Sequence, residues 1–259
     1  MTTTSTVAAA LAEVSQTPVR RVLTVTRLHF VNRWNLIYLP WMILGFIFLI
    51  NYLIWWIVAA ANGKDLQFGM SNGTQYTGAT FYIFVYMLVI AIQAITLTFS
   101  FALSLSVTRR DYYLGTSLTF ALLSLMYGGG MTVLSFIEDA TGGWGLGGHM
   151  FHSVYVGDGA WWSRLFVYSV GLAFFIFLGA LFGAAYMRWR LNGTVALSAL
   201  LALLVLGAVA LITFAGAWPA VGTWFVSSGP TGVAAWLLVP ITIAAVAGFY
   251  LLRRATPKN

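Results

Sequence analysis

Long intervals without a single charged side chain divide this chain of 259 residues. A helix crosses the hydrocarbon layer of a bilayer, about 30 Å thick, with about 20 apolar residues. Only 7% of the residues are charged, against about 25% in soluble domains, which excludes an aqueous globular protein. The sequence therefore predicts an all-α, polytopic membrane protein. The intervals are 34–63, 66–108, 112–137, 165–187 and 191–252.

Six transmembrane helices fit these intervals. The second interval opens with the polar stretch "GMSNGTQYTG", so its helix is expected to start near Thr80. The last interval is long enough for two helices and breaks at "AWPAVGTWFVSSGP", whose prolines and glycines disfavour a continuous helix. A single transmembrane domain is expected over 17–254, between a poorly ordered tail at 1–16 and a short tail at 255–259. The predicted helices are 39–61, 80–105, 113–137, 165–187, 194–215 and 231–252.

The distribution of basic residues predicts the orientation. An even number of spans places both termini on one side, and Lys and Arg are enriched in cytoplasmic loops. Only Lys64 and Arg164 fall on the opposite side, so both termini are predicted to be cytoplasmic and the protein to lie in the plasma membrane. The net charge of +7 then reflects topology, and no nucleic-acid partner is expected. The terminal side carries Arg20, Arg21, Arg27, Arg33, Arg109, Arg110, Arg188, Arg190, Arg253, Arg254 and Lys258.

Two common motifs for chemistry are missing from the sequence. It contains no G-x-x-x-x-G-K-[ST] phosphate loop and no H-E-x-x-H. No ionisable residue lies within a predicted span, whereas proton relays and ion-coupled carriers require such groups at membrane depth. We therefore expect neither an enzyme nor a cofactor in this chain. Uphill transport would need energy from a partner.

One histidine pair in the long outer loop, 138–164, is the candidate metal site. His149 and His152 are spaced i, i+3, which suits zinc if the segment is helical, and Glu138, Asp139 and Asp158 lie in the same loop. The glycine-rich stretch "TGGWGLGGHMFH" instead favours a mobile loop. No metal centre is predicted beyond this pair, and a membrane enzyme acting through it stays an alternative.

A stripe of polar side chains follows the second predicted helix. At 100° per residue its members fall within one narrow sector. The stripe could hydrogen-bond to other helices of the bundle, or it could face a partly hydrated substrate pathway or the centre of a dimer. Either interpretation predicts that it does not face lipid. Its members are Tyr82, Tyr86, Gln93, Thr96, Ser100 and Ser104.

Small residues mark the fourth predicted helix. Gly179 and Gly183 form a G-x-x-x-G pattern, with Ala180 and Ala184 beside them. Such residues allow the backbones of two helices to approach closely. The pattern predicts a helix contact at this face.

The segment 17–36 precedes the first span. Its arginines at 20, 21 and 27 lie off an apolar face, which is typical of a helix lying on the inner leaflet. An ordinary basic flank of the first span is the alternative. The predicted apolar face consists of Val19, Val22, Leu23, Thr26, Phe30 and Trp34.

A cluster of charges, "SVTRRDYYLGT" at 106–116, separates the second and third spans. Thr108 and Asp111 fit a capping box, in which each side chain binds the other residue's backbone N–H. The pattern predicts a short helix with Arg109 and Arg110 exposed, and with the two following tyrosines at the membrane interface. A tight loop with positive-inside arginines would explain the residues equally well.

Together these features resemble the membrane subunits of type-2 ATP-binding-cassette (ABC) exporters. The resemblance rests on the basic stretch before the first span, six spans with cytoplasmic ends, "VTRRDYYLGT" and the Pro/Trp/Gly break before the last span. It implies a coupling helix in the inner turn, docked on an ATPase, and a pair of short re-entrant helices at the outer break. The long loop 138–164 departs from the family pattern. The implied coupling residues are Arg109, Arg110, Asp111, Tyr112 and Tyr113.

The resemblance also implies partners. Two such chains would form a twelve-helix pore on two separate ATPase subunits, which would hold ATP and Mg. Because the spans lack charges, an amphiphilic or apolar substrate is expected, such as a lipid-like compound, a drug or a peptide antibiotic. The alternative is a stand-alone membrane scaffold, sensor or substrate-capturing subunit without ATPase.

Overall fold

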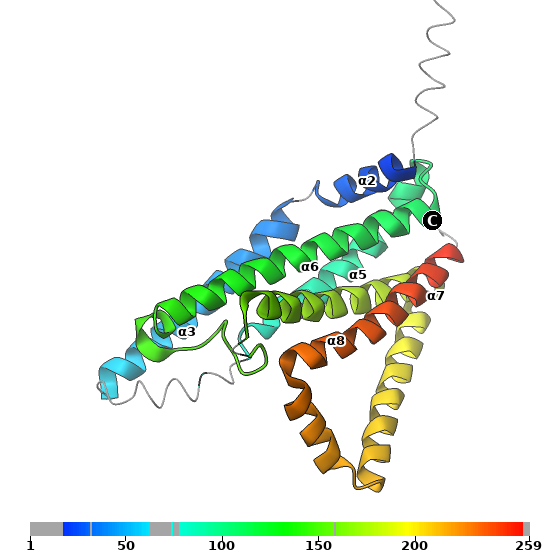
Figure 1. Ribbon diagram of the computed structural model, residues 1–259. Coiled ribbons are helices and arrows are strands. Elements are labelled where there is room, and N and C mark those ends of the chain that lie inside the picture. The colour runs from blue at the N-terminus through cyan, green and yellow to red at the C-terminus, as the bar shows by residue number, and fades with distance from the viewer. Residues whose placement is uncertain (1–17, 32, 63–73, 75–77, 158, 256–259) are drawn as a thin grey trace, which may run out of the picture.

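The computed structural model describes residues 18–31, 33–62, 74, 78–157 and 159–255, and every regular element in these ranges is a helix (Figure 1). Five of the helices are long and apolar enough to cross a membrane. The predicted tail at 1–16 lies outside the described residues, as does the predicted tail at 255–259 except for Ala255. The elements are α2 (Pro18–His29), η1 (Trp34–Tyr38), α3 (Leu39–Asn62), α5 (Phe81–Ser104), α6 (Arg109–Ala140), η2 (Gly143–Gly147), α7 (Trp161–Phe214) and α8 (Trp218–Arg253).

The first three predicted spans correspond to α3, α5 and α6, and α6 is longer than predicted at both ends. Its N-terminus lies at Arg109 because the side chain of Thr108 caps the first turn. We had expected the capping box to begin a separate short helix, and this expectation was wrong. The cap at Thr108 starts the third membrane helix itself.

α7 contains the fourth and fifth predicted spans in one element of 54 residues. A straight helix of that length would measure about 80 Å, far more than the thickness of a bilayer. Its backbone breaks at Arg190, where φ is 58° and ψ is −145°. In Figure 1 the chain turns sharply at this point, and the second half of α7 (yellow) leaves the other helices.

α8 contains the predicted break before the last span. Gly229 has φ 61° and ψ 177°, a conformation open essentially only to glycine, and Pro230 follows it. The segment 218–228 before the break is helical and runs back from the turn at 215–217 toward the bundle (Figure 1).

The first half of α7 is the centre of the packing and contacts α5, α6 and α8. The predicted close approach at Gly179 and Gly183 is confirmed, and its partner is α5. A Cβ atom at Gly179 would lie 2.3 Å from the carbonyl oxygen of Leu88, and one at Gly183 would lie 3.1 Å from the Cβ of Ile95. The two backbones can therefore approach closely only because these positions lack side chains.

The second half of α7 has little protein around it. No residue from 194 to 214 is buried, and large apolar side chains such as Leu203, Leu211 and Phe214 are exposed. An exposed apolar surface of this kind marks contact with a membrane or with another protein.

Replacing Gly179 by alanine should destabilise the protein by about 1–3 kcal/mol, because the added methyl group meets a backbone carbonyl that cannot move aside. The matched control is Gly207→Ala on the same element, where nothing lies within 4 Å of an added Cβ. Alanine favours the helix there, so the control should be neutral or slightly stabilising. Thermal unfolding in mild detergent measures both. Equal melting temperatures for the two variants would contradict the packing.

Candidate functional site

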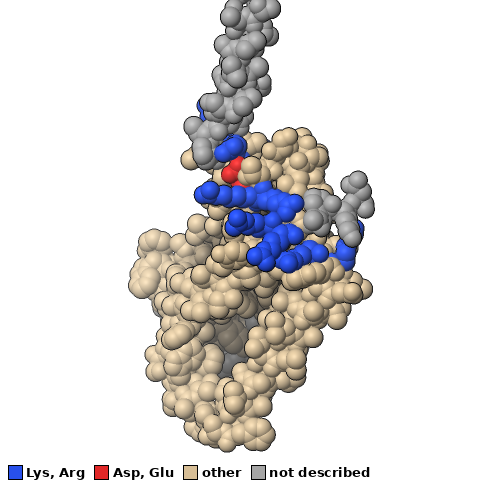
Figure 2. All heavy atoms as spheres, turned by 90° about the vertical axis from the view of Figure 1, so that its right-hand side faces the viewer, with Lys and Arg blue, Asp and Glu red and all other residues tan. Residues whose placement is uncertain are grey.

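Charged side chains lie at two opposite ends of the helices. On α6, Asp111 and Glu138 are about 40 Å apart along the axis, with no charged residue between them. This distance exceeds the hydrocarbon thickness of about 30 Å. We call the two regions the basic end, formed by α2, the start of α6, the break in α7 and the end of α8, and the acidic end, formed by the last turn of α6 and the loop 141–157. Figure 2 shows arginine side chains gathered at the basic end.

At the basic end the Thr108 half of the predicted capping box is confirmed, whereas no bond from the Thr108 backbone N–H to the Asp111 side chain is found among the described residues. The backbone N–H of Asp111 donates to Oγ1 of Thr108 over 3.1 Å. The Asp111 carboxylate forms an ion pair with Arg21 on α2, whose Nε lies 3.1 Å from Oδ2, although the two groups lack hydrogen-bond geometry. The start of α6 is therefore tied to α2.

α2 lies directly on α6 because Gly115 provides no side chain. A Cβ atom there would lie 2.6 Å from the Cβ of Val25. Oγ1 of Thr26 donates to the carbonyl of Gly115 over 3.1 Å, and Nε2 of His29 lies 2.9 Å from Oγ1 of Thr116. Burial lowers the pKa of His29 from 6.5 to about 4, so its imidazole is neutral near pH 7.

The predicted apolar face of α2 is therefore only partly right. The helix is confirmed over 18–29, but the side turned to the protein carries Val25, Thr26 and His29. Val19 and Leu23 of the predicted face are exposed instead. Packing against Gly115 rotates the helix, and the exposed apolar side chains suit a lipid surface.

Tyr112 and Tyr113 were expected at the membrane interface, and both are buried among the helices of this chain. Their depth in the membrane stays a prediction. The hydroxyl of Tyr112 lies 2.8 Å from Oγ1 of Thr98 on α5, and that of Tyr113 donates to the carbonyl of Ala245 on α8 over 2.5 Å. Each ring buries its apolar body while its hydroxyl finds a partner on a neighbouring helix. The sequence could not identify these partners.

The start of α6 thus contacts three other helices. Arg109 donates from an Nη atom to the carbonyl of Arg253 at the end of α8, over 2.8 Å. Of the five predicted coupling residues, Arg110 is exposed, Arg109 is partly buried, and the other three are buried within this chain. Arg110 is therefore an exposed residue on a turn whose neighbouring residues contact α2, α5 and α8. The coupling role itself stays a prediction.

The predicted polar stripe on α5 is divided by the fold. Tyr82 and Tyr86 lie together near the acidic half of the helix, with ring centroids 5.6 Å apart, and the Tyr86 hydroxyl donates to the carbonyl of Asn35. Gln93 and Ser100 are exposed, with no hydrogen bond of theirs to another helix among the described residues. Thr96 and Ser104 bond back to carbonyls of their own helix.

At the acidic end the loop 141–157 folds around one carboxylate, that of Glu138, which is fully buried. Oε2 accepts hydrogen bonds from Nε1 of Trp144 and from the backbone N–H groups of Met150 and Phe151, over 2.9, 2.9 and 3.0 Å. Oε1 accepts from the backbone N–H of His152 over 2.8 Å. These bonds use the acceptor sites that a carboxylate offers. The expected mobile loop is thus a folded cap on α6.

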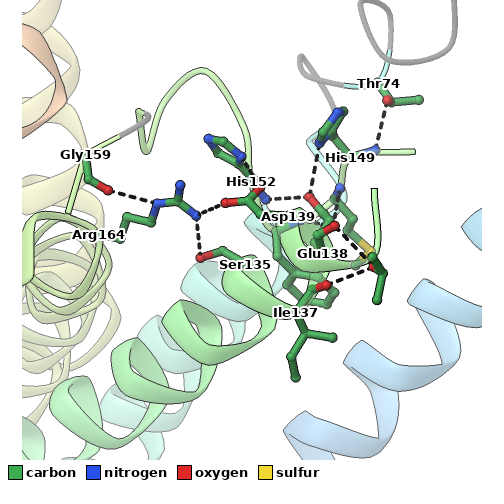
Figure 3. A network of polar contacts seen from close by, with 12 residues as sticks. Thr74, Ser135, Ile137, Glu138, Asp139, His149, His152, Gly159 and Arg164 are labelled. Carbon is green, nitrogen blue, oxygen red and sulfur yellow. Dashed lines mark hydrogen bonds and ion pairs between the residues drawn. The ribbon is translucent and has the colours of Figure 1, made fainter. Parts of the chain in front are cut away.

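Asp139, beside Glu138, binds a second set of groups (Figure 3). Its oxygens lie 2.5 Å from Nδ1 of His152 and 2.6 Å from an Nη atom of Arg164. The buried guanidinium of Arg164 also contacts Oγ of Ser135 and the carbonyl of Gly159, each at 3.3 Å. This ion pair, buried at Arg164 and partly exposed at Asp139, holds α6 against the start of α7.

The histidine pair does not form a metal site with the described residues. The rings of His149 and His152 are 6.0 Å apart, and Nδ1 of His149 lies 3.5 Å from Oε1 of Glu138. The Glu138 oxygens already accept four N–H groups. Within the described ranges no group of three or more His, Cys, Asp or Glu residues could hold a metal ion. Asp158 lies outside those ranges.

An apolar cavity of ≈ 810 Å³ adjoins the acidic end. It lies between the start of α5, the loop 153–156, the first half of α7 and the region of the α8 break, and none of its lining residues is charged. The sequence did not predict this cavity, because it forms between segments that lie far apart in the chain, from Gly78 to Leu237.

Comparison with protein-family models, with curated proteins and with solved structures gave no match. The function is therefore argued from the geometry of the chain.

Glu138→Gln should destabilise the protein by about 3 kcal/mol, because the carboxamide nitrogen would face N–H donors inside a buried network. Asp139→Asn is the matched comparison and should cost about 1 kcal/mol, since Asp139 is partly exposed and the amide oxygen still accepts from Arg164. Thermal unfolding and proteolysis of the loop 141–157 measure both changes. A Gln variant as stable and as protease-resistant as the wild type would contradict the role of Glu138.

Proposed function

We propose that this chain is the transmembrane permease subunit of an ATP-driven ABC exporter. It would work as a pair, either two copies or this chain with a similar one, on two separate ATPase subunits that hold ATP and Mg. The observation that carries the proposal is the start of α6, where one exposed arginine stands on a turn bonded to α2, α5 and α8.

The proposed topology has six crossings. The break at Arg190 supports two spans within α7, and the break at Gly229 supports a last span that starts near residue 231. The basic end would lie in the cytoplasm because Lys and Arg are enriched on that side, with the acidic end outside the plasma membrane. The segment 218–228 would take the place of the re-entrant helices of the family.

Exposed surfaces of the single chain support the presence of a second chain in the membrane. The exposed second half of α7 needs lipid or protein around it, and Gln93 lies at the middle of α5 without a partner helix among the described residues. A carboxamide facing lipid is costly. A second permease chain would cover it at the substrate pathway.

Energy transfer would pass through Arg110. Closure of the ATPase subunits would push on this residue, and the buried contacts of Tyr112 and Tyr113 would carry the movement to α5 and α8. Because no charged residue lies between the two ends of α6, the substrate would be amphiphilic or apolar. A stand-alone scaffold, sensor or substrate-capturing subunit is the alternative.

Purification of the tagged chain from its native membrane tests the proposal. A soluble ATPase should co-purify in stoichiometric amount, and Arg110→Glu should lower its yield about tenfold, because a charge of the wrong sign enters the contact. Arg27→Glu is the matched control, since it makes the same change at an exposed position of α2 and should leave the yield nearly unchanged. Isolation of the wild-type chain without an ATPase in mild detergent would contradict the exporter and favour the stand-alone alternative.

A further inference from the structure

The cavity at the acidic end is lined mostly by apolar side chains. Phe81, Phe84 and Phe175 form one part of the lining, with ring centroids 5.4 to 6.1 Å apart, and Val233 and Leu237 of α8 form another. Its volume of ≈ 810 Å³ is in the range of ligand sites, about 300–1,000 Å³. A ligand portion held here would meet hydrocarbon and aromatic surface.

Four polar side chains line the cavity, those of Thr80, Ser153, Tyr155 and Tyr168. The hydroxyl of Tyr168 donates to the carbonyl of Phe151 in the folded loop. The side chain of Tyr155 is 65% exposed and stands at the border of the cavity. Polar atoms of a ligand would find few partners inside and would be placed near Tyr155 at lower cost.

The break in α8 shapes this cavity. Gly229 and Pro230 both line it, and the change of direction there separates the segment 218–228 from the last span. A Cβ atom at Gly157 would lie 3.0 Å from Cγ of Pro230, so the folded loop touches the break directly. The loop also contributes residues 153–156 to the wall, so the hydrogen bonds of Glu138 to its backbone position one side of the cavity.

We infer that this cavity binds the hydrocarbon chain of a membrane amphiphile. The chain would enter from the bilayer between helices that span it, while the polar group of the amphiphile stays at the acidic end near Tyr155. As the substrate class of the exporter this inference rests on the proposed function, whereas the binding itself needs no ATPase. The site lies within a single chain and does not include the polar stripe on α5, which is proposed to lie between the two permease chains.

A palmitic acid that carries a photoactivatable diazirine on its chain tests the site in the full-length purified protein, in mild detergent. Label should concentrate in the segments 167–175 and 225–237, which contribute residues to the cavity lining, and excess unmodified palmitic acid should remove it. Val233→Trp fills the cavity and should lower labelling about tenfold. The matched control Val239→Trp, at an exposed position of α8 outside the cavity, should label like the wild type.

Label spread evenly over the exposed helices, including 194–214, and unaffected by competitor would overturn the inference. Equal labelling of the two tryptophan variants would also overturn it. If Val233→Trp fails to fold, the positions of the label and its competition by palmitic acid in the wild-type protein decide whether the cavity binds the hydrocarbon chain. If the cavity is labelled but the chain purifies without an ATPase, the exporter proposal fails and the binding site stands. If an ATPase co-purifies but the cavity is not labelled, the binding site fails and the exporter proposal stands.

Discussion

The confinement of charge to the two ends of the helices is the constraint on which the rest of the structure depends. A bilayer of about 30 Å of hydrocarbon tolerates an ionised side chain only at high cost. α6 satisfies this limit with Asp111 at one end, Glu138 at the other and an uncharged stretch between them. All ion pairs described in the chain consequently lie at one end or the other. The bundle between them is held by packing and by neutral hydrogen bonds.

Neutral contacts hold the bundle in two ways. Glycines at 115 and 179 bring the backbone of one helix against the next, where a single methyl group would collide. Buried hydroxyls, such as those of Tyr112 and Tyr113, bond to neighbouring helices, so that these two polar groups have partners within the bundle. These contacts connect the exposed arginine at the basic end to the helices that form the cavity wall. The two candidate sites therefore belong to one packed unit.

Much of the fold could be predicted from the sequence because charge and helix breakers are local signals. The bounds of α5 came within one residue, the cap at Thr108 was identified from two residue types, and the break near Gly229 followed from its glycine and proline. The burial of Tyr112 and Tyr113 depends on which helices are neighbours, which no local pattern gives. The fold of the loop around Glu138 was missed for the same reason, because its donors are mostly backbone N–H groups, which leave no mark in the sequence.

The central claim is that the basic end and the acidic end lie on opposite sides of a membrane, and the chain offers a direct test because it contains no cysteine. Arg254→Cys places a thiol at an exposed position of the basic end, and Tyr155→Cys places one at the acidic end. A membrane-impermeant maleimide applied to intact cells should label the cysteine at 155 and reach the one at 254 only after the membrane is permeabilised. Labelling of both positions in intact cells would contradict the claim, and labelling of position 254 alone would reverse the proposed orientation.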